Sequence, residues 1–158
     1  MKVLLINPPF TDYGGLEGHG GKTAPLNLGY LAAYLRSRKP EVDITILDCE
    51  GLRLSYDKIE GKISQLKPDI VGITAPTPAF AQVLEISQRI RKLSPDIKIV
   101  VGGPHPSAFP EKTALEPTID FVVYGEGEVT FTELVDAIDH NKNLESIAGL
   151  AFRNGNVK

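Results

Sequence analysis

The sequence predicts a doubly wound α/β fold, in which helices cover both faces of an open, parallel, five-stranded sheet. Short and almost wholly apolar runs alternate along the chain with amphipathic segments of helical period. Continuous apolar runs are typical of parallel strands that are buried on both faces. A proline-containing turn also follows three of the amphipathic segments and leads directly into the next apolar run. Together these features predict repeated strand–helix units.

Five runs rich in Val, Ile, Leu or Phe are the expected strands, at residues 2–7, 43–48, 70–75, 97–102 and 121–124. Apolar residues spaced three or four positions apart predict helices around residues 28–35, 59–66, 83–93 and 131–138. This alternation implies right-handed crossovers between neighbouring parallel strands.

The two kinds of turn differ in composition. Residues 39–41, 67–69 and 94–96 read KPE, KPD and SPD, and proline ends a helix because it cannot continue the hydrogen-bond ladder. The segments that follow strands instead carry nine of the fifteen glycines, five of them between residues 14 and 21. Open α/β sheets bind ligands at the carboxyl ends of their strands. The glycine-rich edge is therefore the predicted ligand site.

Length and composition limit the number of domains, the partners and the compartment. The chain has 158 residues, a formal net charge of −3 and one cysteine, Cys49. This size suits one domain with a single core. The absence of a basic patch and of a long apolar run argues against nucleic-acid and membrane partners. One cysteine allows no internal disulfide and no thiolate cluster, so a cytoplasmic protein is expected.

The end of the sequence differs from the rest. Residues 150–153 read as a strand, Asn154 and Gly155 as a hairpin turn, and the last residues as the start of a return strand. We expect a Rossmann-like domain over residues 1–145. Residues 146–158 are then a hairpin and linker that lead to a catalytic domain absent from this chain.

Several residues of the glycine-rich edge suit a ligand. Gly102 and Gly103 follow a strand and allow backbone N–H groups to approach a phosphate or amide, although a plain tight turn would need the same residues. Gly72 interrupts a strand, which indicates a close approach by a helix or by a ligand. Thr74 and Thr77 could contact the ligand or cap the next helix. His105 could donate a hydrogen bond, and an isolated histidine is a poor metal signal.

No catalytic signature is present. The sequence has no Gly-Lys-Ser/Thr phosphate loop, no Gly-x-Ser-x-Gly elbow and no pairing of a nucleophile with a base. We therefore assign no catalytic and no metal-ligating residue, and predict that this chain holds a ligand while any catalysis belongs to its parent protein.

At these loops the sequence resembles the N-terminal B12-binding domain of cobalamin-dependent radical SAM enzymes. Five motifs occur in that family's order and together extend over essentially the whole chain. They are residues 2–9 (KVLLINPP) with 25–35 (PLNLGYLAAYL), 68–74 (PDIVGIT), 101–106 (VGGPHP), 124–128 (YGEGE) and 147–152 (IAGLAF).

The resemblance implies a flavodoxin-like sheet of order 2-1-3-4-5 with the nucleotide tail of cobalamin near strands one and three. By position, Thr74, Pro76 and Thr77 would line the tail groove beside Gly72. The nucleotide would be flanked by Gly102, Gly103, Pro104, His105, Gly125, Glu126 and Gly127. The corrin side would be faced by Asn7, Pro8 and Pro9.

Two departures refine this expectation. Many cobalamin domains carry Asp-x-His-x-x-Gly after the first strand, whereas residues 7–14 here read NPPFTDYG, so no histidine ligand to cobalt is expected from this loop. The Cys-x-x-x-Cys-x-x-Cys motif of an iron–sulfur cluster is also missing. S-adenosylmethionine and the cluster are therefore expected only in the absent radical SAM domain, which would perform methyl transfer or related radical chemistry.

Two alternatives remain at this point. A flavin- or nucleotide-binding domain could have the same topology, because the fold does not select the ligand. Pro8 and Pro9 argue against it, since they remove backbone donors where a phosphate loop would need them. A regulatory or interaction domain without a ligand is the second alternative.

Overall fold

The structure is a computed structural model that describes residues 1–10 and 24–153. The predicted glycine-rich loop at residues 14–21 and the predicted Asn-Gly turn and return strand lie outside the described residues. Strands are β1 (Lys2–Asn7), β2 (Asp43–Asp48), β3 (Ile70–Thr74), β4 (Lys98–Gly102), β5 (Phe121–Val123) and β6 (Leu150–Phe152). Helices are α1 (Leu26–Arg38), α2 (Tyr56–Leu66), η1 (Thr77–Ala79), α3 (Phe80–Leu93), α4 (Pro104–Ala108), α5 (Pro110–Ala114) and α6 (Gly127–His140).

The strands form one sheet of order β2-β1-β3-β4-β5-β6. β1 to β5 are parallel and follow the predicted order 2-1-3-4-5. The expectation of five strands is wrong, because β6 pairs antiparallel with β5 and makes a sixth. The predicted strand at residues 150–153 therefore completes the edge of the sheet itself.

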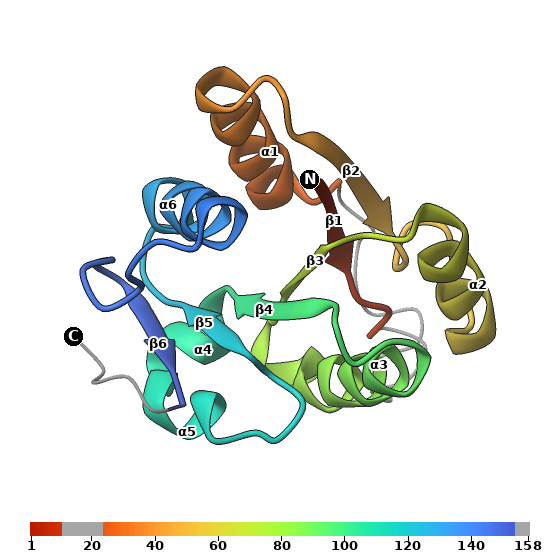
Figure 1. Ribbon diagram of the computed structural model, residues 1–158. Coiled ribbons are helices and arrows are strands. Elements are labelled where there is room, and N and C mark those ends of the chain that lie inside the picture. Colours follow the sequence, from red (N-terminus) through yellow and green to blue (C-terminus); the bar gives the residue numbers. More distant parts are fainter. Residues whose placement is uncertain (11–23, 154–158) are drawn as a thin grey trace.

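Helices cover both faces of the sheet, as a doubly wound fold requires. α1 and α6 lie on one face, and α2 and α3 lie on the other (Figure 1). Alternate residues of a strand belong to two separate apolar clusters, because successive side chains point to opposite faces of the sheet. On β1, Leu5 packs in the cluster under α1 and α6, whereas Leu4 and Ile6 pack in the cluster under α2 and α3.

The connection from β4 to β5 was not foreseen. It contains two short helices, α4 and α5, each five residues long with proline near its start. Proline suits the first turn of a helix because that N–H has no intrahelical partner. Such short helices have too few turns to show an apolar period. The expected stripe of α3 also needs one correction, since Leu93 is exposed.

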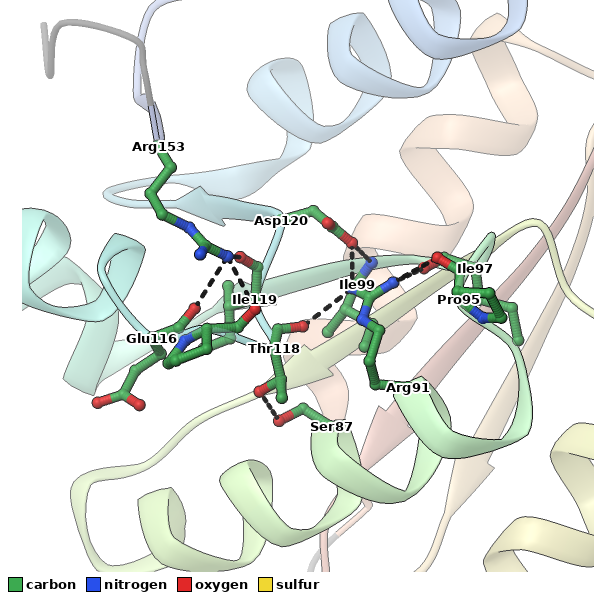
Figure 2. Close-up of polar contacts among 11 residues, drawn as sticks. Ser87, Arg91, Pro95, Ile97, Ile99, Glu116, Thr118, Ile119, Asp120 and Arg153 are labelled. Atoms are coloured by element: carbon green, nitrogen blue, oxygen red, sulfur yellow. Dashed lines mark hydrogen bonds and ion pairs between the residues drawn. The ribbon is translucent and has the colours of Figure 1, made fainter.

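At the amino edge of the sheet, arginine side chains connect the ends of β4, β5 and β6. α1, α2 and α3 end two residues before Pro40, Pro68 and Pro95. Figure 2 shows the two arginines of this edge. The Arg91 guanidinium donates to the carbonyls of Pro95, Ile97 and Thr118 and to the Asp120 carboxylate.

Asp120 and Arg153 extend this network to the strand ends. The Asp120 carboxylate also accepts the backbone N–H of Ile99 at 2.8 Å. Arg153 follows β6 and donates to the carbonyl oxygens of Glu116, Pro117 and Ile119 (Figure 2). The starts of β4 and β5 and the end of β6 are thereby held together.

Candidate functional site

A cavity of about 160 Å³ lies between the sheet and helices α1 and α6, near the carboxyl ends of the strands. Apolar side chains from both layers form most of its wall. They are Leu5, Leu28, Leu31, Val100, Val123 and Phe131. All except the half-buried Leu31 belong to the buried core, so the cavity is a gap inside a packed layer.

Gly72 forms part of the cavity wall without a side chain of its own. In the register of the sheet, Gly72 lies between Leu5 of β1 and Val100 of β4. A Cβ atom at this position would lie 2.8 Å from Leu5 Cδ2 and 3.6 Å from Phe131 Cε2. The Leu5 side chain therefore packs over the glycine, and Leu5 and Phe131 both lie in the cavity wall. Any larger residue at position 72 would displace Leu5 and change the shape of the cavity.

Asn27 and Thr74 lie where the cavity opens. The Asn27 amide, in the first turn of α1, donates to the Thr74 hydroxyl at the end of β3, at 2.9 Å. Thr74 is thus bound to α1, and η1 has no side-chain cap. Gly103 has a φ of +102°, and a Cβ there would lie 3.0 Å from Thr74 Oγ1 and 3.1 Å from the Ala75 nitrogen. Only glycine suits this close approach.

Outside this opening lies a wider groove of about 900 Å³. It is lined by residues of the loops after β1, β2, β3, β4 and β5, and by the start of α1. Asn27, Thr74, Gly103, Gly125 and Glu126 line both the cavity and the groove, so the two spaces are continuous there. We call these five residues the neck. A bulky ligand can rest in the groove while a narrower part enters the cavity.

The lining carries acidic but no basic side chains among the described residues. Glu50, Glu126 and Glu128 line one or both spaces, and no Lys, Arg or His does so. Glu50 is buried and accepts the backbone N–H of Phe10 at 2.9 Å. Positive potential comes instead from the N-terminus of α6, which begins at Gly127.

Most of the predicted site residues come together here. The cavity or the groove is lined by Asn7, Gly72, Thr74, Pro76, Gly102, Gly103, Pro104, Gly125, Glu126 and Gly127. The structure places Pro8, Pro9, Thr77 and His105 outside both linings. Pro8 and Pro9 are buried, and Thr77 is exposed on η1.

His105 lies in a small aromatic cluster. Its ring stacks on Phe80 with the centroids 3.9 Å apart, and it contacts Phe109 at 5.4 Å. Burial, and then the positive charge of Lys112, lower the pKa of His105, which favours a neutral ring. Its assignment to the nucleotide stays a prediction.

Sequence reasoning missed the helical half of the site. Leu28 and Leu31 were recognised only as members of an apolar stripe, and Phe131 likewise. Asn27 was not identified. The signal available for it was an amide side chain in the first helical turn, directly before that stripe. The pairing with Thr74 needs the tertiary structure.

Reactive and metal-binding groups are scarce in the described part of the chain. Burial, together with the nearby Asp48 charge, raises the pKa of Cys49 to about 12, so this thiol stays protonated. No group of three or more His, Cys, Asp or Glu side chains among residues 1–10 and 24–153 could hold a metal ion. Within the same ranges no helix is both long and apolar enough to cross a membrane.

The chain is similar to longer proteins. It is 40% identical to an uncharacterized methyltransferase of Pyrococcus horikoshii, over all of this chain and 34% of that protein. It is 38% identical to the anaerobic magnesium-protoporphyrin IX monomethyl ester cyclase of Rubrivivax gelatinosus, over 96% of this chain and 28% of that one. The chain therefore spans about a third or less of these relatives.

A solved structure of a methyltransferase is also similar to this chain. The radical S-adenosylmethionine methyltransferase TsrM from Kitasatospora setae, with cobalamin and a [4Fe-4S] cluster bound, superposes with a TM-score of 0.78 and 26% identity. The match covers 94% of this chain and 26% of TsrM. The B12 binding domain family matches residues 18–135. The chain belongs to the B12-binding domain family, and it is similar to the cobalamin-binding modules of radical SAM methyltransferases.

Proposed function

We propose that this chain holds cobalamin at the carboxyl edge of its sheet, as the cofactor-binding module of a radical SAM enzyme. One observation supports this best: an apolar cavity beside Gly72 that is continuous with a much larger groove. Cobalamin has the corresponding shape, a broad corrin ring and a narrower nucleotide tail. When bound, it supplies the methyl-carrying cobalt chemistry, while the protein supplies placement.

The residues divide into three roles in this proposal. Those of the cavity and the neck, chiefly Gly72, Thr74 and Gly103, would receive the tail. Gly102, Pro104 and Gly125 to Gly127 would lie beside the nucleotide, and Asn7 would face the corrin side. Pro76, which the resemblance assigns to the tail groove, lines only the outer groove, and we propose that it also faces the corrin side. The Asn7 side chain has a fixed orientation at this edge, because its amide donates a hydrogen bond to Asp48 Oδ1 at 2.8 Å.

The charge of the lining favours cobalamin over a flavin mononucleotide or a nucleoside phosphate. A terminal phosphate carries about two negative charges at neutral pH, and the described lining offers three carboxylates and no basic side chain to meet it. The phosphodiester of cobalamin carries one charge, which backbone N–H groups and the N-terminus of α6 can accept.

The activity of the parent protein follows from the same proposal. A radical SAM domain of the same protein would bind S-adenosylmethionine and an iron–sulfur cluster and would cover the corrin ring. The similarity to methyltransferases supports methyl transfer as the reaction class, with residues 146–158 leading toward that domain.

Binding to the purified chain tests the proposal directly. We expect hydroxocobalamin, mixed with micromolar protein, to elute with the protein on gel filtration. Gly72→Ala should weaken this binding about tenfold, because the added methyl group would lie 2.8 Å from Leu5 Cδ2 and displace this side chain of the cavity wall. Gly61→Ala is the matched control, since a Cβ at that helical position meets nothing within 4 Å. Elution of all the corrin with the small molecules would contradict the proposal.

A further inference from the structure

We infer that this site selects among cobamides by the base at the end of their nucleotide tail, and that it prefers a benzimidazole to a purine. The inference rests on the proposed function and concerns what the cavity accepts. Cobamides share the corrin ring and differ in this base. A cavity that receives the base therefore determines which cobamide binds most tightly.

The volume of the cavity limits how much of the base can enter. An apolar cavity of about 150 Å³ binds benzene, and this one measures about 160 Å³. It has room for one six-membered ring. The second ring of a fused base would then lie in the neck, between Asn27, Thr74 and Glu126, which line both spaces.

The polar groups of the wall gather at the neck end. Asn27 belongs to the first turn of α1, Thr74 ends β3, and Glu126 and Glu128 lie at the start of α6. The side chains that come from the middle of the sheet and from within the helices are apolar. Leu5 and Val100 lie on either side of Gly72, and Phe131 approaches the same position from α6.

The two bases present different atoms to these two regions. In a benzimidazole the six-membered ring contains only carbon, and both nitrogens belong to the five-membered ring that is attached to the ribose. Adenine carries two ring nitrogens and an amino group on its six-membered ring. Inside the apolar end these groups would lose their hydrogen bonds to water without replacement. Leaving buried polar groups unpaired weakens binding by about tenfold to a hundredfold.

The test compares three corrinoids as their dicyano forms, in which cyanide replaces the base on cobalt in the two compounds that have one. The dissociation constants of dicyanocobalamin, dicyano-adeninylcobamide and dicyanocobinamide for residues 1–158 are measured by equilibrium dialysis with corrin absorbance. We expect dicyanocobalamin to bind at least about tenfold more tightly than the adeninyl compound. Cobinamide, which has no base, should also bind more weakly than cobalamin.

Two neighbouring valines of β4 provide a matched pair of variants. Val100 lines the cavity, whereas Val101 is equally buried in the cluster on the opposite face. Val100→Thr places a hydroxyl in the apolar end of the cavity. It should reduce the preference for cobalamin over the adeninyl compound severalfold. Val101→Thr introduces the same buried hydroxyl elsewhere and should lower stability while leaving the preference unchanged.

The outcomes separate this inference from the proposed function. Equal affinity for cobalamin and the adeninyl compound, or for cobalamin and cobinamide, would overturn the base selectivity and leave corrinoid binding intact. A preference that Val100→Thr and Val101→Thr alter equally would overturn the role of the cavity. Failure of all three corrinoids to bind would overturn the proposed function and this inference together.

Discussion

At the amino edge of the sheet, Arg91 and Arg153 connect the ends of β4, β5 and β6 through hydrogen bonds to six carbonyl groups. At the carboxyl edge of the same sheet, glycines line an open cavity and groove instead. The two helices over the cavity show the same contrast along their length. Lys39, directly after α1, pairs with Asp136 near the end of α6, whereas the first turns of α1 and α6 line the cavity and the groove.

This difference shows how one sheet can provide both stability and a binding site. Charge-assisted hydrogen bonds from the partly buried Arg91 and the exposed Arg153 hold the strand ends together at one edge. The other edge can then leave its backbone groups and its apolar gap available to a ligand. Changes at the amino edge should therefore affect stability, and changes at the carboxyl edge should affect binding.

The largest effect should come from Asp120→Ala at the amino edge. The variant removes the acceptor for both Arg91 and the Ile99 N–H, and we expect a loss of about 2–3 kcal/mol in the free energy of unfolding. Urea denaturation measures this loss. Cobalamin affinity should stay within about twofold of the wild type. Asp96→Ala, at an exposed acid of a neighbouring turn, is the control and should change neither quantity.

A smaller loss of stability is expected from substitutions at two glycines of the carboxyl edge, and it should differ between them. Gly103→Ala should lose about 1–3 kcal/mol of stability and also weaken cobalamin binding, because its Cβ would press against Thr74 and the backbone of Ala75. Gly125 also has a positive φ, of +75°, but a Cβ there meets nothing within 4 Å. Gly125→Ala should lose only the backbone cost in stability, about 1–2 kcal/mol. Because Gly125 itself lines the neck, the two variants are compared by their free energies of unfolding, and a greater loss for Gly125→Ala than for Gly103→Ala would contradict the close packing of Gly103 against Thr74.

The smallest effect should be the pH dependence of the ion pairs at the far ends of α1 and α6. Hydrogen bonds from Lys142 and Lys39 lower the pKa of Asp136 from 3.8 to about 2. This carboxylate therefore stabilises the fold above about pH 4, and its contribution is lost as the pH falls toward 2. Asp136→Asn should cost less than about 1 kcal/mol at pH 7, as partly solvated ion pairs do.

Urea midpoints between pH 7 and pH 3 check this prediction. The difference between Asp136→Asn and the wild type should be constant above about pH 5 and should shrink below about pH 4. Asp139→Asn, at an exposed acid of the same helix, is the control. A difference that grows on acidification would contradict the assignment of the stabilisation to the Asp136 carboxylate.

Much of this fold and the location of its site could be predicted from local patterns. The apolar runs, the helical stripes and the three proline turns fix the strand–helix alternation, because each depends on residues within a few positions of one another. The crossover rule then makes the strands parallel and brings Gly72, Gly102, Gly103 and Gly125 to one edge. The resemblance to B12-binding domains supplied the ligand and the strand order, which local patterns do not provide.

The sequence by itself determined the element types, the parallel strands and the glycine-rich edge, since these follow from short-range periodicity and turn chemistry. The tertiary structure alone decided the volume of the cavity, the pairing of β6 with β5 and the surroundings of His105. It also decided the contact between Asn27 and Thr74, which are 47 positions apart. The physical reason is that these features arise where side chains of separate elements meet, and their distances depend on how whole layers pack.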